Sequence, residues 1–155
     1  MGKRLVLLLI FVILPISVFA FTEIKKVSTR YYLADQLTRI PEYFTGKEYT
    51  GNRIILRTNV EREGFYFSFP LDKKFYKFPT STRVFLSVIH SGNPIAKAFT
   101  FELPVDRKGK KEILLGITGK DWPSSETNTL AWKIEVKNRA GKLLAHKKSF
   151  LWDHD

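Results

Sequence analysis

Cysteine is absent from this sequence of 155 residues. Its absence excludes disulfides, a thiol nucleophile and a lipid anchor attached to cysteine. An exported chain without disulfides fits a bacterial envelope better than a eukaryotic secretory route, where small domains commonly depend on disulfides. No Asn-x-Ser/Thr acceptor for N-glycosylation is present either, which agrees with a bacterial setting.

The motifs of common enzymes are also missing. The sequence contains no Gly-x-Ser-x-Gly elbow, no Gly-rich phosphate-binding loop and no His-Glu-x-x-His helix. The three histidines, His90, His146 and His154, are not spaced as metal ligands. Asp153, His154 and Asp155 stand together, but at a chain end, where solvation is the rule. We therefore predict no catalytic residue, no metal site and no cofactor; an enzyme built from carboxylates that folding brings together is the remote alternative.

Long apolar runs occur only at the N-terminus. Lys3 and Arg4 precede an unbroken apolar run over residues 5–14, and small residues near Ala20 suit signal peptidase. We predict that residues 1–20 are a signal peptide that is cleaved after Ala20, with export to the periplasm or the exterior of a bacterium. The alternative is a retained membrane anchor, but a span needs about 20 apolar residues and this run is shorter.

The charge balance is strongly basic. Lys and Arg number 26 against 15 Asp and Glu, a formal net charge of +11, and loss of residues 1–20 would lower it to +9. Such a charge attracts acidic proteins, anionic polymers and lipid headgroups. Basic charge alone is not a nucleic-acid signature, and an exported protein has limited access to nucleic acid, so no nucleic-acid partner is expected.

From residue 53 onward the pattern is typical of β-strands, because apolar and polar residues alternate between turn residues. Two hairpins are predicted, over residues 83–103 and 130–152, and the second turns at Gly141. No strand–helix–strand alternation appears, which disfavours a parallel sheet. We predict a mainly β fold, an antiparallel two-sheet sandwich of about seven strands, which resembles immunoglobulin-like or fibronectin-like domains in architecture only.

The second hairpin is expected to supply much of the core. Trp132, Ile134 and Val136 share one face of its first strand, and Phe150 lies on the return strand. A hairpin cannot bury an apolar face alone, so these side chains need an opposing sheet. The sequence shows no linker or repeat, and we assign residues 53–155 to one β-sandwich domain.

Residues 21–52 are predicted to be an N-terminal segment that packs on the domain through one short helix. Apolar residues three or four apart over Ser28–Ile40 favour that helix, and Pro41 would end it. The segment is also aromatic, and we expect its rings to dock on the sheets; the alternative is that they line a groove. They are Tyr31, Tyr32, Tyr43, Phe44 and Tyr49.

Two candidate contact sites follow from the sequence. The first combines three cations with three rings, and it consists of Lys73, Lys74, Phe75, Tyr76, Lys77 and Phe78. It suits an anionic surface, with the alternative that it is an edge strand protected by lysine. The second is Trp122 beside Pro123 in a Gly-flanked loop, which either faces a ligand or closes one end of the core.

The function predicted from these features is binding rather than catalysis. We expect an exported, non-enzymatic β-sandwich protein that binds a protein partner in the cell envelope or outside the cell, by edge-strand pairing or loop contact. The alternative is recognition of an anionic polysaccharide or membrane through residues 73–78. The sequence does not define an oligomeric state.

Overall fold

The computed structural model describes residues 22–153, so the predicted signal peptide and the Ala20 cleavage site lie outside the described residues. The described part is mainly β, with two short helices and three short 3-10 turns. In chain order the elements are β1 Thr22–Glu23, β2 Ser28–Tyr32, α1 Ala34–Leu37, α2 Ile40–Thr45, β3 Arg53–Arg57, β4 Gly64–Pro70, η1 Phe75–Lys77, β5 Arg83–His90, β6 Asn93–Glu102, β7 Glu112–Thr118, η2 Gly119–Asp121, β8 Thr129–Lys137, β9 Leu143–Lys148 and η3 Phe150–Asp153.

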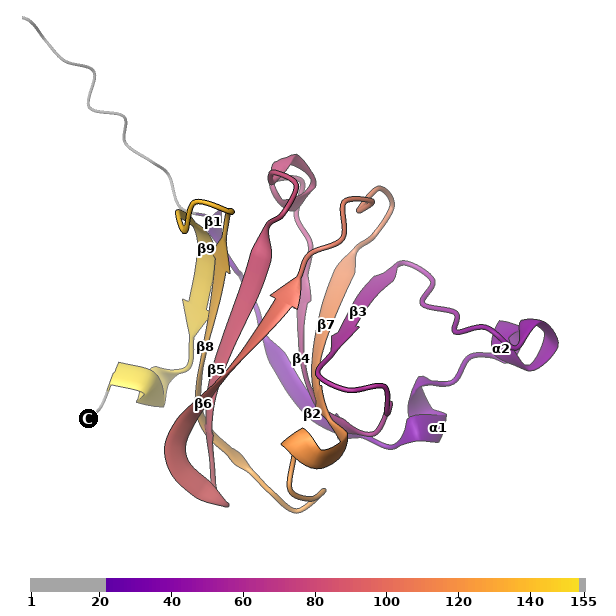
Figure 1. Cartoon of the computed structure of the whole chain (residues 1–155), viewed down its shortest axis with the longest axis horizontal. Helices are drawn as coiled ribbons and strands as arrows, with labels where there is room; N and C mark the ends of the chain where they lie inside the picture. Colours follow the sequence, from indigo (N-terminus) through magenta and orange to yellow (C-terminus); the bar gives the residue numbers. More distant parts are fainter. Residues whose placement is uncertain (1–21, 154–155) are drawn as a thin grey trace, which may run out of the picture.

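The strands form two sheets (Figure 1). Sheet A has the order β1-β9-β8-β5-β6, and sheet B has the order β2-β4-β7-β3. Most neighbours are antiparallel, but β1 runs parallel to β9 and β3 runs parallel to β7. The prediction of purely antiparallel sheets is therefore wrong at these two edges. Both strands reach their edge from a distant part of the chain, so no tight hairpin forces them to be antiparallel.

One apolar core lies between the sheets. The Phe67 ring from β4 meets the Trp132 ring from β8 edge to face, with centroids 6.0 Å apart. Full burial of a large apolar side chain contributes about 1.5–3 kcal/mol, so this shared core holds the two sheets together. Its members with 0% exposure come from both sheets: Phe67, Ile113, Leu115 and Ile117 from sheet B, and Val84, Leu86, Ile134, Val136 and Ala145 from sheet A.

Both predicted hairpins are present, as β5–β6 and β8–β9. In the second turn, the Asn138 N–H donates to the Lys142 carbonyl at 3.0 Å, and Gly141 has φ +83°. Gly141 is needed there because side chains disfavour positive φ. The expectation that Phe150 fills the core is wrong: the strand ends at residue 148, and Phe150 is 83% exposed on η3.

The helix predicted over Ser28–Ile40 is present only at Ala34–Leu37, as α1, and the prediction is wrong for the residues before it. Residues 28–32 form β2, which pairs with β4 from Ser28 opposite Ser68 to Tyr32 opposite Gly64. Pairing with β4 forms backbone hydrogen bonds along five residues at once, and this outweighs a weak helical pattern rich in Tyr and Thr. Pro41 does not end a helix but lies in the first turn of α2, where a missing N–H costs nothing.

Residues 33–52, here called the arm, connect the two outer strands of sheet B. β2 and β3 lie at opposite edges of that sheet, so the arm must cross from one edge to the other. Leu37 from α1 is 2% exposed and forms a second, small core with Tyr66 and Leu114. Figure 1 shows that α2 lies at the far end of the arm, away from both sheets.

Candidate functional site

The basic aromatic stretch over residues 73–78 lies in the loop between β4 and β5. Its centre is η1, a short 3-10 turn, and it does not pair as a strand. The Asp72 carboxylate accepts the Lys74 N–H at 2.8 Å, which folds the backbone back on itself. The alternative that this stretch is an edge strand is therefore wrong.

The side chains of this stretch divide between core and surface. Phe75 is 1% exposed and packs between Phe69 and Phe78, whose ring centroids lie 6.0 and 4.8 Å away. A buried ring has no surface to offer a ligand, so the stretch presents cations and one phenol rather than three rings. The exposed members are Lys73, Lys74, Tyr76 and Lys77.

The turn over residues 106–111 lies against this stretch and adds to its positive charge. The Tyr76 hydroxyl donates to the Lys110 carbonyl, and Arg107 Nη2 donates to the Phe78 carbonyl. We call residues 72–78 together with residues 106–111 the basic end. The sequence marks both segments as basic, but Tyr76 and Lys110 are 34 positions apart, and only the fold brings them together.

Arg107 is a buried cation within the basic end. It is 5% exposed, and its Nε and Nη1 atoms have no hydrogen-bond partner among the described residues. Removal from water lowers the pKa of Arg107, because burial disfavours the charged form. Its guanidinium is enclosed, so Arg107 anchors the turn to the Phe78 carbonyl instead of meeting a ligand.

Trp122 lies at the opposite end of the sheets, after β7. Its ring is 5% exposed and stacks on Phe65, with centroids 4.5 Å apart and planes 19° apart. His90 approaches the same ring at 5.2 Å. Glu61 and Glu63 line a shallow hollow beside it. Trp122 thus closes this end of the core, and a contact role for it stays a prediction.

The arm holds exposed apolar residues on α2, two of which the sequence analysis expected to dock on the sheets. Ile40, Tyr43 and Phe44 are 74%, 78% and 85% exposed. They are three and four positions apart on α2, so they share one face of that helix. The expectation that the rings of residues 21–52 dock on the sheets is correct for Tyr32, which packs on Tyr66, and wrong for Tyr43 and Phe44.

Two ion pairs attach the arm to sheet B and the loop after β3. The Arg57 guanidinium binds both Glu48 carboxylate oxygens at 2.5 and 3.0 Å. Arg62 Nη1 binds the Glu42 carboxylate at 2.6 Å, and the Glu42 side chain is 8% exposed. Bidentate and partly buried pairs of this kind are geometrically specific, so the arm is a fixed projection.

The carboxyl groups in these pairs have a pKa below their ordinary value. The Arg57 hydrogen bond lowers the pKa of Glu48 against the opposing effect of burial. For Glu42, burial raises the pKa, but hydrogen bonds from Arg62 and from backbone N–H groups outweigh it, and the pKa lies below its usual value. Both groups therefore stay ionised at neutral pH and hold their arginines.

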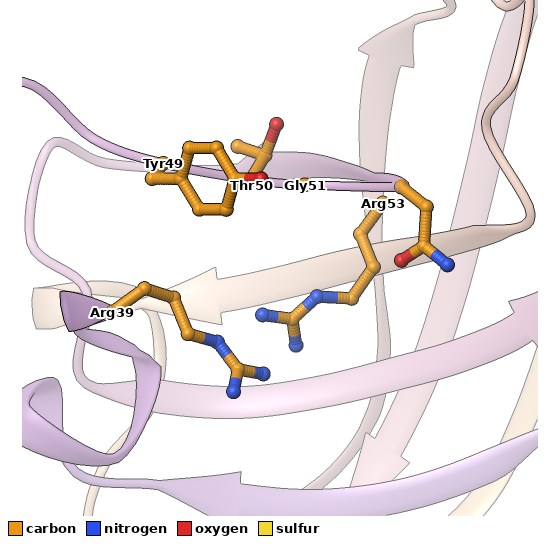
Figure 2. Close-up of a pocket in the computed structure, with 6 residues that line it drawn as sticks. Arg39, Tyr49, Thr50, Gly51 and Arg53 are labelled. Carbon is orange, nitrogen blue, oxygen red and sulfur yellow. The ribbon is translucent and has the colours of Figure 1, made fainter. Parts of the chain in front are cut away.

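A pocket of about 280 Å³ lies between the arm and β3. Figure 2 shows the side chains of Arg39 and Arg53 reaching from opposite sides, so that their guanidinium groups face the same space. Tyr49, Thr50 and Gly51 close one side, and Asn52 completes the lining. Neither Arg39 nor Arg53 makes an ion pair among the residues that the structure describes.

Sequence reasoning missed this pocket, because Arg39 and Arg53 are isolated cations in the sequence. The only available signal was the combination of Gly46, Gly51 and three aromatic residues in one loop, which marks an irregular segment without defining its shape.

No family model, curated protein or solved structure matches the chain. No helix within residues 22–153 is long and apolar enough to cross a membrane. In the same range, no three His, Asp or Glu side chains gather in a group that could hold a metal ion. The site must therefore be interpreted from its own geometry.

Proposed function

We propose that this chain is an exported, non-enzymatic binding module that docks a partner protein of the cell envelope onto the arm. The observation that carries the proposal is the exposed face of Ile40, Tyr43 and Phe44 on a helix that two ion pairs hold in place. Exposed aromatic anchors on a fixed element are typical of the central residues of protein interfaces.

The projection of α2 favours a protein partner. A helix that extends beyond both sheets can enter a groove on another molecule without a clash between the main bodies (Figure 1). The positive charge of the chain would speed encounter with an acidic partner. The alternative is that the partner pairs with β6 as an additional strand. β6 forms one edge of sheet A, and its side chains are mostly exposed.

The proposed scaffold is a β-sandwich of immunoglobulin-like or fibronectin-like architecture. Its support is strand order: β4 pairs with β7 in one sheet, and β5, β8 and β9 are neighbours in the other. This order parallels the B–E and C–F–G neighbours of such domains. β3 departs from the pattern, because it occupies the edge beside β7 yet precedes β4 in the chain. Sandwiches of this type bind through loops and edges.

The test is site-specific crosslinking in the producing cell. A photoreactive phenylalanine at position 43 should give one discrete crosslinked protein. The same group at position 60 is the matched control, because Val60 is 95% exposed but lies in the loop between β3 and β4. Equal crosslinking from both positions would overturn the proposal.

A variant separates contact from folding. Tyr43→Ser combined with Phe44→Ser should abolish co-purification of the partner that crosslinking identifies, while the melting temperature stays unchanged, because both side chains are exposed. Recovery of the same partner at wild-type level by this variant would show that the arm is not the docking element.

A second candidate function is binding of an anionic polysaccharide or membrane surface through the basic end. The observation that favours it is the joining of two lysine-rich segments by the Tyr76 hydroxyl and Arg107. Clustered lysines on one end of a protein attract anionic surfaces in a salt-dependent manner.

A further inference from the structure

We infer that the pocket between the arm and β3 is a binding site for a phosphate-type oxyanion, held between the guanidinium groups of Arg39 and Arg53 (Figure 2). The inference stands apart from the partner proposed for α2. It concerns a different set of side chains and a small ligand group, carried by a free phosphate ester or by a lipid headgroup.

The first argument is uncompensated charge. The two glutamates of the arm are already committed, Glu42 to Arg62 and Glu48 to Arg57. Glu112 is the neighbour of Arg53 in the β3–β7 register, yet the described residues contain no ion pair between them. Two like charges that face one space repel each other. An anion between the two guanidinium groups offsets this repulsion and is attracted to both.

The second argument is the match in charge and geometry. A guanidinium presents planar, forked N–H donors that bind phosphate oxygens in pairs. Two such groups from opposite sides supply a formal charge of +2, which matches a dianionic phosphate monoester better than a single carboxylate. The Thr50 hydroxyl and the Asn52 amide in the lining offer further donors.

The third argument is that the turn that forms one side of the pocket is held in place before any ligand arrives. The Arg53 N–H donates to the Thr50 carbonyl at 3.1 Å, closing the turn over residues 50–53. Lys110 Nζ donates to the Gly51 carbonyl at 2.8 Å, and the Lys111 N–H donates to the Asn52 carbonyl at 2.7 Å. The backbone of this turn therefore loses little conformational freedom on binding.

Lys110 also brings a third positive charge to the rear of that turn. Because Lys110 belongs to the basic end, the pocket continues the positive surface of residues 72–78 and 106–111. Cations beyond direct contact still raise the local concentration of an anion. The pocket is therefore the part of this surface where an anion would meet guanidinium groups from two sides.

The experiment is a titration of the purified protein with inorganic phosphate, followed by the amide NMR signals of Gly51 and Asn52, with chloride added to keep ionic strength constant. We expect saturable shifts with a dissociation constant of about 1 mM or lower. Linear shifts without saturation, or the same shifts with chloride alone, would overturn the inference.

Variants locate the site. Arg39→Gln and Arg53→Gln should each weaken phosphate binding about tenfold or more, since each removes a forked charged donor. Arg39→Lys should weaken it less, because the charge remains and only the fork is lost. The matched control is Arg139→Gln, which removes the same charge from the exposed turn between β8 and β9. An equal effect from Arg139→Gln would show general attraction and no site.

Two further experiments distinguish the possible sources of the phosphate group and separate this inference from the proposed function. If a lipid headgroup carries the phosphate, the protein should bind vesicles that contain phosphatidic acid, and this binding should require Arg39 and Arg53. If only the binding of soluble phosphate requires these arginines, the ligand is a phosphate ester in solution. The Tyr43→Ser, Phe44→Ser variant should bind phosphate as the wild type does. Loss in this variant would contradict independence of the two surfaces.

Discussion

Gly116 lies beneath the Tyr66 ring on the outer face of sheet B. A Cβ at position 116 would lie 2.5 Å from that ring. The Tyr66 hydroxyl accepts from Arg57 Nε at 2.8 Å and donates to the Arg62 carbonyl at 2.6 Å. Arg57 and Arg62 hold the arm. Gly116 therefore helps to anchor the arm, because it leaves room for the Tyr66 ring that contacts both arginines.

Gly116→Ala is expected to destabilise the protein by about 1–3 kcal/mol, because the fully buried Tyr66 has no room to move aside. Denaturant unfolding measures the change. The same substitution in a Tyr66→Leu background should cost clearly less, since the smaller side chain relieves the contact. Additive costs in this double-mutant cycle would contradict the proposed clash.

Phe67→Ala is expected to cost about 3–5 kcal/mol, because the side chain is 0% exposed and its removal leaves a cavity between the sheets. Phe44→Ala is the matched control, and its 85% exposure predicts a change within about 0.5 kcal/mol. Thermal unfolding of the two variants distinguishes the cases. Similar losses from both would mean that α2 is covered by something within the same chain.

At the scale of elements, the arm is expected to detach in acid before the sheets unfold. Glu42 and Glu48 have a lowered pKa in the folded protein. A lowered pKa contributes stability that is present above the unfolded value of 4.5 and is lost as pH falls through the folded value. Protonation releases Arg62 and Arg57, and the arm is then held by Leu37 in its small core and by the hydrogen bonds of Gly51 and Asn52 to residues 110 and 111.

Hydrogen exchange at residues 33–52, compared with residues 83–90, measures this detachment across the acidic range. Glu48→Gln should speed exchange of the arm at neutral pH and reduce the pH dependence, because only the Glu42–Arg62 pair is then left to titrate. If the arm and β5 exchange at the same rate at every pH, the arm does not detach before the sheets unfold.

The elements differ in how far the sequence could predict them. The alternation in β5 (Val84, Leu86 and Val88, all buried) and the turn at Gly141 are local signals, and both hairpins were predicted correctly. β2 was predicted as a helix because its strand character comes from pairing with β4, which local spacing does not contain. The Arg39–Arg53 pocket depends on the path of the arm across sheet B, a long-range feature of the same kind.

At the scale of the whole molecule, charge is divided between the two ends of the sheets. Pro70 at the end of β4 pairs with Glu112 at the start of β7, so η1 and residues 106–111 share one end. The β7 strand then runs to the other end, where Asp121 and the nearby Glu61 and Glu63 lie. A protein with such a distribution approaches an anionic surface with its basic end first.

Lys73→Glu combined with Lys74→Glu is the variant that tests this orientation. Each basic residue near an anionic surface contributes about 1 kcal/mol, so the double variant should bind anionic vesicles at least about tenfold more weakly. Both side chains are exposed, and stability should change by less than about 0.5 kcal/mol.

Vesicle sedimentation at low and moderate salt measures the effect. Wild-type binding should fall as salt rises, because exposed charges are screened beyond about 8 Å at physiological ionic strength. Lys120→Glu is the control, and it should leave binding near the wild-type value because η2 follows β7 at the opposite end of the sheets. The single substitution Lys74→Glu matches Lys120→Glu in charge. If Lys120→Glu weakens binding as much as this single substitution does, net charge alone explains the attraction and the basic end has no special role. If only the lysines of the basic end matter, the fold has joined two ordinary basic turns into one directed surface.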